Sequence, residues 1–320
     1  LYRPQRERSV KSLVEYCENV KNQYGLNRVA FIGAAVSDYS HIEDLIGELE
    51  SRGFEISVPS MRIESITHNI LVSLKRSGLK TLTIAPESIY RLRVRMNKDI
   101  SDEEIFNLVS DALSLGFNLK FYFLIGLPTE TDEDIEELIG YIKKINNLPK
   151  EIKNKTVSSD NITSGSDNSI GKMSFSINPV IPKPHTPLQW YPYDMKSNKK
   201  KIKHLKKELG HLNIKFSSAR MGLIQYILAC GDHNTGKLLE QSLIVKLSTQ
   251  DWLNNIPSYE LNDNLPWDNI NVRANKEFLK EEYNKILNNE LTPWCEQDGC
   301  YNCGPCKPEL RKIKKTKGVY

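Results

Sequence analysis

Four of the six cysteines stand close together near the end of the 320-residue chain. They follow the spacing C-x4-C-x2-C-x2-C, and the glycines and the proline between them favour tight turns. Four thiolates that are so close in sequence can enclose one metal centre, either a structural zinc or an iron–sulfur cluster. Disulfides are less favoured, because the sequence shows no secretory signal. The predicted metal ligands are Cys295, Cys300, Cys303 and Cys306.

Polar or small residues also follow a series of short apolar segments in the first part of the chain. An arginine in such a place can pair a carboxylate with two hydrogen bonds, and a glutamate can accept from a ribose diol or an amine. Glycine lets a ligand approach the backbone. Tight turns and surface ion pairs would explain several of these residues equally well. The candidates for ligand binding are Ser37, Asp38, Ser60, Arg62, Glu87, Gly126, Glu130 and Asn178.

The elements that must position these candidates alternate between helix and strand. Ser9, Thr67 and Thr131 are each followed by apolar residues at helical spacing, so each is predicted to begin a helix. Two further helices are predicted to begin with capping boxes, Ser40–Glu43 and Ser101–Glu104. Between the helices lie five apolar segments that are predicted to be strands, at residues 29–32, 54–58, 79–85, 119–125 and 173–177.

Repeated strand–helix units return the chain to the same side of a sheet, which predicts an α/β fold of parallel strands with helices outside. Functional groups in such folds sit at the carboxyl ends of the strands, where the candidates above are found. The sequence opens with a helix and has no strand before it. We therefore expect that a first strand is missing from this sequence.

The composition changes after residue 192, which predicts three parts. Residues 1–192 form the α/β part, residues 193–290 form a mainly helical region, and residues 291–320 hold the cysteines and a basic tail. The segment 153–171 is rich in Asn, Ser, Asp and Thr, so it is predicted to be a flexible surface insertion. The basic tail is either a solvated terminus or a contact for phosphates, through Arg311, Lys312, Lys314, Lys315 and Lys317.

Overall charge and hydropathy exclude some classes of protein. The 44 basic and 40 acidic residues give a net charge of +4, which is too balanced to indicate nucleic-acid binding. The sequence has no apolar run of the ~18 residues that a membrane-spanning helix needs. Crowded cysteines without a secretory signal indicate a reducing compartment, and we expect a cytoplasmic protein.

Three longer segments carry a resemblance to a known family. The segments TIAPES, FYFLIGLPTETDEDI and FSINPVIPKPHTPLQW, in this order, resemble the radical S-adenosylmethionine (SAM) superfamily. Among its members, the branch associated with a cobalamin (B12)-binding domain is the most similar. The resemblance implies an open, TIM-like partial (β/α)6 barrel, in which a loop with the spacing C-x3-C-x2-C holds a [4Fe–4S] cluster that binds SAM.

The resemblance also implies an activity. Such enzymes accept an electron from a reductant such as ferredoxin or flavodoxin and cleave SAM to a 5′-deoxyadenosyl radical, and some transfer methyl groups with cobalamin. By position, Ser37 and Asp38 match the contacts to the methionine amine, and Ser60 and Arg62 match those to its carboxylate. Glu87 matches the ribose contact, and the turn 126–130 lies by the adenine. The substrate cannot be inferred from the sequence.

One departure from the family matters. The spacing C-x3-C-x2-C does not occur in this sequence, and the C-terminal quartet has a different spacing at the wrong end of the fold. We therefore expect that the sequence begins just after the cluster loop and that the activity belongs to a longer parent protein. One alternative is a catalytically inactive metal-binding barrel that contacts RNA through the basic tail. Another is an unrelated (β/α) enzyme with a zinc-binding tail, whose acid–base pair would be Glu87 and His185.

Overall fold

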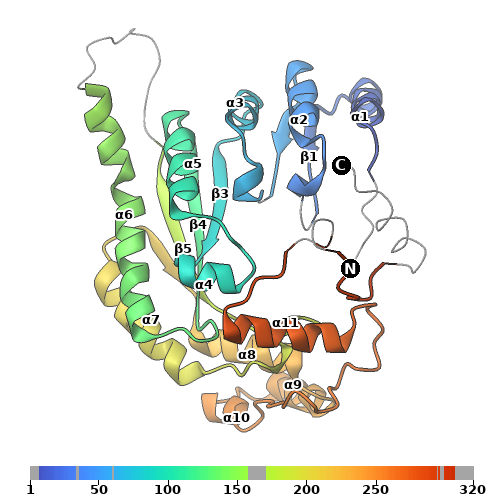
Figure 1. Ribbon diagram of the computed structural model, residues 1–320, viewed down its shortest axis with the longest axis vertical. Helices are drawn as coiled ribbons and strands as arrows, with labels where there is room; N and C mark the ends of the chain where they lie inside the picture. Colours follow the sequence, from blue (N-terminus) through green and yellow to red (C-terminus); the bar gives the residue numbers. More distant parts are fainter. Residues whose placement is uncertain are drawn as a thin grey trace.

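The computed structural model of the chain describes residues 7–33, 36–59, 61–157, 171–293, 295 and 299–306. Within these ranges the chain alternates between helix and strand up to the last strand and is helical after it (Figure 1). The strands are β1 (Arg28–Ala30), β2 (Glu55–Ser57), β3 (Thr81–Glu87), β4 (Asn118–Ile125), β5 (Met173–Pro179) and β6 (Ile214–Phe216).

Helices cover the outer side of the strands. Figure 1 shows α1, α2, α3, α5 and α6 side by side along that side, and α7 packs against α6. The short helix α4 follows β3 directly. The helices of this part are α1 (Val10–Tyr24), α2 (Ile42–Ser51), α3 (His68–Arg76), α4 (Tyr90–Arg95), α5 (Asp102–Ser114), α6 (Asp132–Val157) and α7 (Met195–Leu209).

Every pairing between the described strands is parallel and joins strands that are consecutive in the chain. This confirms the predicted α/β fold of parallel strands. The strands form two sheets, with the orders β1-β2 and β3-β4-β5-β6. The four-stranded sheet is the more deeply buried, because Ile84, Phe121 and Phe175 pair across it and are almost fully covered.

Strand β6 was not predicted from the sequence. It has three residues and no alternating pattern long enough to stand out, but it pairs with β5 through Phe175, Ser176 and Ile177. The sheet therefore continues beyond the predicted boundary at residue 192, and α7 is the helix that connects β5 to β6. Among the described residues, six strands are present and none precedes α1.

The end of β5 corrects a second prediction. The predicted strand ends at residue 177, but β5 runs on to Pro179, opposite Ile125 of β4. The backbone N–H and C=O groups of the odd-numbered residues of β5 point toward β6. Strand β6 ends at Phe216, which lies opposite Ile177. Pro179 therefore lies where no strand partner would need the N–H group that proline lacks.

The helix starts were predicted well, with one exception. Ser9 and Thr67 cap α1 and α3, and Ser101 with Glu104 forms the predicted capping box. The predicted box of Ser40 with Glu43 is wrong. Glu43 instead accepts hydrogen bonds from Thr67 and Asn69, which joins α2 to the start of α3, and Ser40 donates to Glu7.

The Asn- and Ser-rich segment begins inside a helix. Helix α6 continues to Val157, so residues 153–157 of the predicted insertion are helical. The rest of the predicted insertion, residues 158–170, lies outside the described residues, as does the basic tail 311–317.

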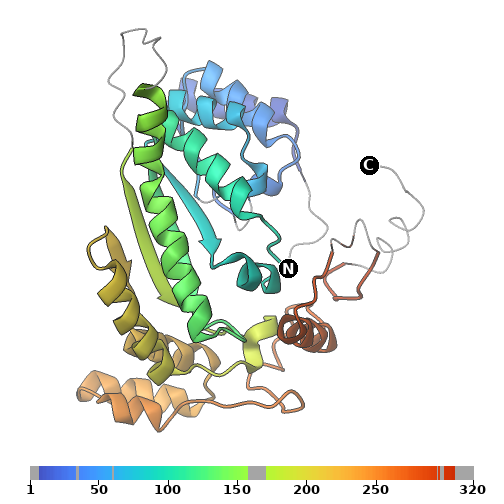
Figure 2. The same cartoon turned by 60° about the vertical axis from the view of Figure 1, so that its left-hand side comes forward.

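The C-terminal region has a hydrophobic core of its own. The region comprises α8 (Ala219–Cys230), α9 (Asn234–Ile244), α10 (Thr249–Leu253) and α11 (Lys276–Asn288). The buried side chains of its core include Tyr226, Trp252 and Trp267. Figure 2 shows the strands of the larger sheet pointing toward this region. The C-terminal helices therefore lie beyond the carboxyl ends of the strands, on the side where the candidate residues are found. No helix in the described ranges is long and apolar enough to cross a membrane.

Candidate functional site

The carboxyl ends of β1 and β2 are joined by Arg62. Its backbone N–H donates to the hydroxyl of Ser37 at 3.0 Å, and its guanidinium Nε lies 3.4 Å from Oδ1 of Asp38. The Ser37 side chain is buried, whereas those of Arg62 and Asp38 are 39% and 23% exposed. The structure thus brings three predicted residues together and leaves the charged pair of Asp38 and Arg62 partly exposed. The fourth residue predicted for these two turns, Ser60, lies outside the described residues.

At the end of β3, Glu87 pairs with a residue whose role was not predicted. Oε1 of Glu87 lies 2.9 Å from Nζ of Lys98, which also donates to the carbonyl of Ala85 at 2.8 Å. Glu87 has a φ of 66°, a left-handed conformation that is uncommon for a residue with a side chain. The sequence showed Lys98 only as one of several nearby basic residues, and no local pattern indicated that it faces Glu87.

The turn after β4 is buried and forms a dense set of contacts. Oε1 of Glu130 accepts the N–H of Gly126 at 2.8 Å and lies 2.6 Å from Nζ of Lys201 on α7. The side chains of Glu130 and Lys201 are only 1% and 10% exposed. Gly126 has a φ of 75°, and a Cβ atom there would lie 2.5 Å from Oδ1 of Asn198. This turn therefore connects β4 to α7, and Glu130 supports the turn from within.

Lys201 and Asn198 were missed because they stand in the strongly basic stretch 196–207, where many lysines surround them. A signal was nonetheless present. Asn198, Lys201, Ile202, Leu205 and Leu209 recur at helical spacing and form the buried stripe of α7.

A second ion pair supports the same turn from α4. Nε of Arg91 donates to Oδ1 of Asp134 at 3.0 Å, and Nη2 donates to the carbonyl of Thr129 at 3.3 Å. Burial by itself would raise the pKa of Asp134. The hydrogen bonds from Arg91 and Thr131 outweigh burial, so the pKa of this carboxyl lies below its usual value.

Asn178 lies at the end of β5, where it joins the last two strands. Its side-chain oxygen accepts the hydroxyl of Ser217, and the N–H of Ser217 donates to Ile177 at 3.0 Å. His185 follows in the proline-rich segment with a φ of 57°, and its N–H donates to Gln189. Trp267 donates to the same Gln189 oxygen at 2.8 Å, which anchors the segment to the C-terminal core.

The four C-terminal cysteines lie beside the start of α11. The N–H of Asn275 donates to the carbonyl of Cys303 at 2.8 Å, and the N–H of Asn302 donates to Sγ of Cys300 at 3.4 Å. Burial, with the three neighbouring thiols, raises the pKa of Cys303. In the part of the chain that the structure describes, no three His, Cys, Asp or Glu side chains are arranged to hold a metal ion. The metal site of the four cysteines therefore stays a prediction.

The same finding applies to the cluster that the family resemblance implies. The described residues contain no ligand set for a [4Fe–4S] cluster at the carboxyl ends of the strands. The side chains present fit SAM itself better. Asp38 and Glu87 can accept hydrogen bonds from an amine and a ribose diol, and Arg62 can pair with a carboxylate.

Two curated proteins are similar in sequence to the chain. "Uncharacterized protein MJ0966" of Methanocaldococcus jannaschii is 37% identical over 246 residues, which is 76% of this chain and 50% of that protein. "Uncharacterized methyltransferase PH0819" of Pyrococcus horikoshii is 24% identical over 143 residues, which is 44% of this chain and 31% of that protein. The chain thus spans half of the first relative's length and less than a third of the second's.

Solved structures are similar only at a distance. The match to the Streptococcus suis protein SuiB covers 78% of this chain and 49% of the SuiB chain, with a TM-score of 0.41 and 12% identity. The match to the radical SAM methyltransferase TsrM from Kitasatospora setae covers 44% of this chain and 29% of the TsrM chain, with a TM-score of 0.36 and 16% identity.

A family model identifies the first part of the chain. The model of the Radical SAM superfamily matches residues 1–142, a range that includes β1 to β4 and the turn after β4. The candidates at the ends of these strands, from Ser37 to Glu130, lie inside the matched range. The similarity to the Radical SAM superfamily therefore covers residues 1–142 of the chain.

Proposed function

We propose that the carboxyl ends of β1 to β4 bind SAM in a radical SAM enzyme. The observation that carries this proposal is the partly exposed pair of Asp38 and Arg62, which with the buried Ser37 joins the ends of two parallel strands within the range that the family model matches. An arginine and an aspartate that remain partly exposed can exchange their mutual contact for the charges of an amino acid.

Each residue has a distinct proposed role. Arg62 binds the carboxylate of the methionine part, Asp38 accepts from its amine, and Ser37 positions Arg62 by accepting its N–H. Glu87 accepts from the ribose diol, and Lys98 keeps that carboxylate in place. Gly126 offers backbone to the adenine. Glu130 acts indirectly, because its Oε1 is already bonded to Gly126 and Lys201.

The iron–sulfur chemistry needs residues that the described part of the chain does not provide. When bound, a reduced [4Fe–4S] cluster supplies the electron that cleaves SAM. We propose that its cysteines belong to a part of the parent protein outside these 320 residues. A reductant such as ferredoxin or flavodoxin, in the cytoplasm, would supply the electrons. The residues of this chain would orient SAM and exclude water from it.

Methyl transfer is the proposed outcome. The support is the name of the second relative, a methyltransferase that is 24% identical to this chain. Cobalamin is the proposed methyl carrier, as in the branch that the sequence resembles.

Anaerobic turnover of the full-length parent protein tests the proposal. After chemical reduction with SAM present, we expect 5′-deoxyadenosine or S-adenosylhomocysteine as a product. Arg62→Ala should weaken SAM binding by about tenfold or more, the effect of losing a charge-assisted contact. Arg76→Ala, which changes an exposed arginine at the opposite edge of the sheet, is the matched control. Equal effects of the two variants, or no cleavage of SAM by a protein with its full iron content, would refute the proposal.

The four cysteines are proposed to form a separate metal centre, either zinc or an auxiliary iron–sulfur cluster. Their spacing and their position beside Asn275 support this proposal. Replacing all four with serine in the full-length protein should remove one zinc, or one cluster's iron and sulfide, from the metal count. An unchanged count of zinc, iron and sulfide would contradict it.

A further inference from the structure

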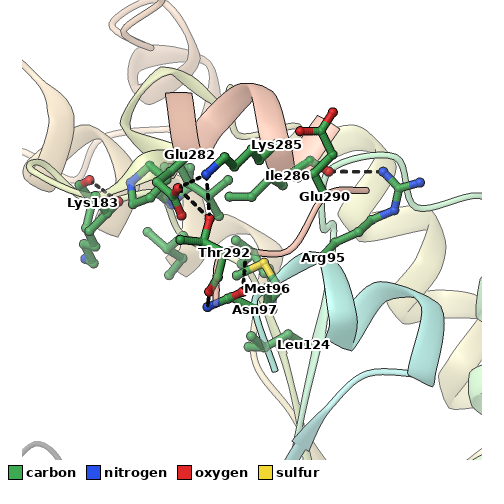
Figure 3. Close-up of a pocket in the computed structure, with 17 residues that line it drawn as sticks. Arg95, Met96, Asn97, Leu124, Lys183, Glu282, Lys285, Ile286, Glu290 and Thr292 are labelled. Atoms are coloured by element: carbon green, nitrogen blue, oxygen red, sulfur yellow. Dashed lines mark hydrogen bonds and ion pairs between the residues drawn. The ribbon is translucent and has the colours of Figure 1, made fainter. Parts of the chain in front are cut away.

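A pocket of about 460 Å³ lies at the carboxyl ends of β4 and β5. Leu124 of β4 and Pro179 of β5 form its base, Met96 follows α4, and Ile286 of α11 closes it from the far side. Figure 3 shows α4 and α11 contributing side chains to the same space. The pocket therefore opens on the edge of the sheet where SAM is proposed to bind, but it is formed largely by elements beyond residue 142.

The walls of this pocket are mostly apolar and are held rigidly. The segment from Pro179 to Pro187 forms one wall, and its prolines restrict the backbone. The opposite wall, α11, is fixed at its C-terminal end by α4. Nη1 of Arg95 donates to the carbonyls of Ile286 and Leu287 at 3.1 and 3.0 Å. The side chain of Asn97 exchanges two hydrogen bonds of 2.9 Å with the backbone of Thr292. These contacts hold both walls of the cavity in place.

Most charges that line the pocket are already paired. Lys285 lies 3.1 Å from Oε1 of Glu282 and donates to the hydroxyl of Thr292, as Figure 3 shows. Arg95 is bonded to the end of α11, although its buried Nε has no partner among the described residues. Glu290 is exposed, and in Figure 3 it lies at the Arg95 end of the pocket.

Lys183 differs from these residues. It stands at the other end of the pocket, its side chain is exposed, and its ammonium group has no hydrogen bond or ion pair within the described ranges, although its charge acts on the buried thiol of Cys230. The pocket therefore combines an apolar body with a cationic group at one end. Such a site favours a molecule whose apolar part fills the cavity while an acidic group meets the lysine.

We infer that this pocket binds an amphipathic organic anion, with its apolar body between Met96 and Ile286 and its acidic group at Lys183. We assign such a molecule as the substrate of the enzyme proposed above, and this assignment rests on the proposed function. Binding does not, because it depends only on residues of this pocket and can be measured without SAM or metal.

A pair of fluorescent probes tests the inference. 8-Anilinonaphthalene-1-sulfonate and N-phenyl-1-naphthylamine share an apolar body, but only the first carries an anionic group. We expect both to bind the unmodified chain. Lys183→Gln should weaken the sulfonate about fivefold, the effect of losing one exposed charge pair, and leave the neutral probe unchanged. Lys215→Gln, at an exposed lysine on β6, should change neither affinity.

Filling the cavity provides the second arm. Ile286→Trp and Met96→Trp, which act from opposite walls, should each weaken both probes more than tenfold. Thermal unfolding and far-UV circular dichroism check that each variant is folded. Leu243→Glu removes exposed apolar surface on α9, outside the pocket, and should leave binding unchanged. The inference fails if folded cavity-filling variants bind both probes normally, if Leu243→Glu abolishes binding, or if Lys183→Gln affects the two probes equally. None of these results would bear on SAM cleavage by the parent protein.

Discussion

The ends of β1 and β2 and the end of β4 carry the same kinds of residues in different surroundings. Arg62 and Asp38 lie 3.4 Å apart and are 39% and 23% exposed. Lys201 and Glu130 lie 2.6 Å apart and are 10% and 1% exposed. An exposed pair contributes little to stability and can rearrange around a ligand, whereas a buried pair cannot lose one partner without a large cost. The first pair is therefore suited to binding, and the second to holding β4 against α7.

Removing Lys201 should have the largest effect on stability. Lys201→Met leaves the carboxylate of Glu130 buried without its cation, which costs about 3 to 5 kcal/mol of unfolding free energy. Urea denaturation at pH 7 measures this change. Lys200→Met is the matched control, because Lys200 pairs with Asp132 at the surface and its loss should have little effect. If the two neighbouring lysines proved equally dispensable, the distinction between the two strand ends would be lost.

A glycine variant tests the close packing of the same turn. Gly126→Ala introduces a Cβ atom 2.5 Å from Oδ1 of Asn198 at a φ of 75°, and we expect a cost of about 1 to 3 kcal/mol. Gly140→Ala is the control. It lies inside α6 with nothing near its Cβ position, so it should stabilise the protein by about 0.5 to 1 kcal/mol. A stabilising effect at both glycines would show that Asn198 does not press on the turn.

The pH dependence of stability should report on Asp134. Its pKa is lower in the folded chain than in the unfolded chain, so it contributes stability above its unfolded pKa and loses it as the pH falls through the folded pKa. Asp134→Asn should cost about 1 to 2 kcal/mol at pH 7 and flatten the fall in stability below about pH 4. Asp111→Asn, at an exposed residue of α5, should leave that slope unchanged. Denaturation curves of both variants between pH 2 and 7 measure these slopes, and equal slopes in the two variants would contradict the prediction.

Arg62 should show the smallest effect on stability. Arg62→Ala removes two partly exposed ion pairs, with Asp38 and Glu64, so we expect a change of less than about 1 kcal/mol, although the same variant should impair SAM binding in the parent protein. Differential scanning calorimetry of this chain measures the first quantity. A loss of stability as large as that of Lys201→Met would mean that Arg62 has a structural role.

Local sequence patterns predicted the strands and most helix starts, because these depend on nearby residues. The capping box of Ser101 and Glu104 is an example, since three residues separate its partners. The same pattern failed at Ser40 and Glu43, where Thr67 and Asn69 compete for the carboxylate from another helix. Strand β6 was missed because its three residues depend on β5 and carry little signal of their own.

The candidate site was predictable in part. The order of strands was enough to place Ser37, Asp38 and Arg62 at one edge, and the structure joins them. The partners of Glu87 and Glu130 were not predictable. Lys98 reaches Glu87 through the path of the chain after α4, and Lys201 approaches Glu130 from a helix that begins more than sixty residues later.

The sequence by itself determined the order of the first five strands and the helices between them, their parallel arrangement and the similarity of residues 1–142 to the Radical SAM superfamily, because each depends on periodicity or on short segments of chain. Only the tertiary structure decided which charged residues are buried, which remain exposed at the edge of the sheet, and that α11 closes a pocket over β4 and β5. The physical reason is that burial and ion pairing depend on contacts between residues far apart in the chain, and the local pattern around a lysine is the same whether it faces water or a carboxylate.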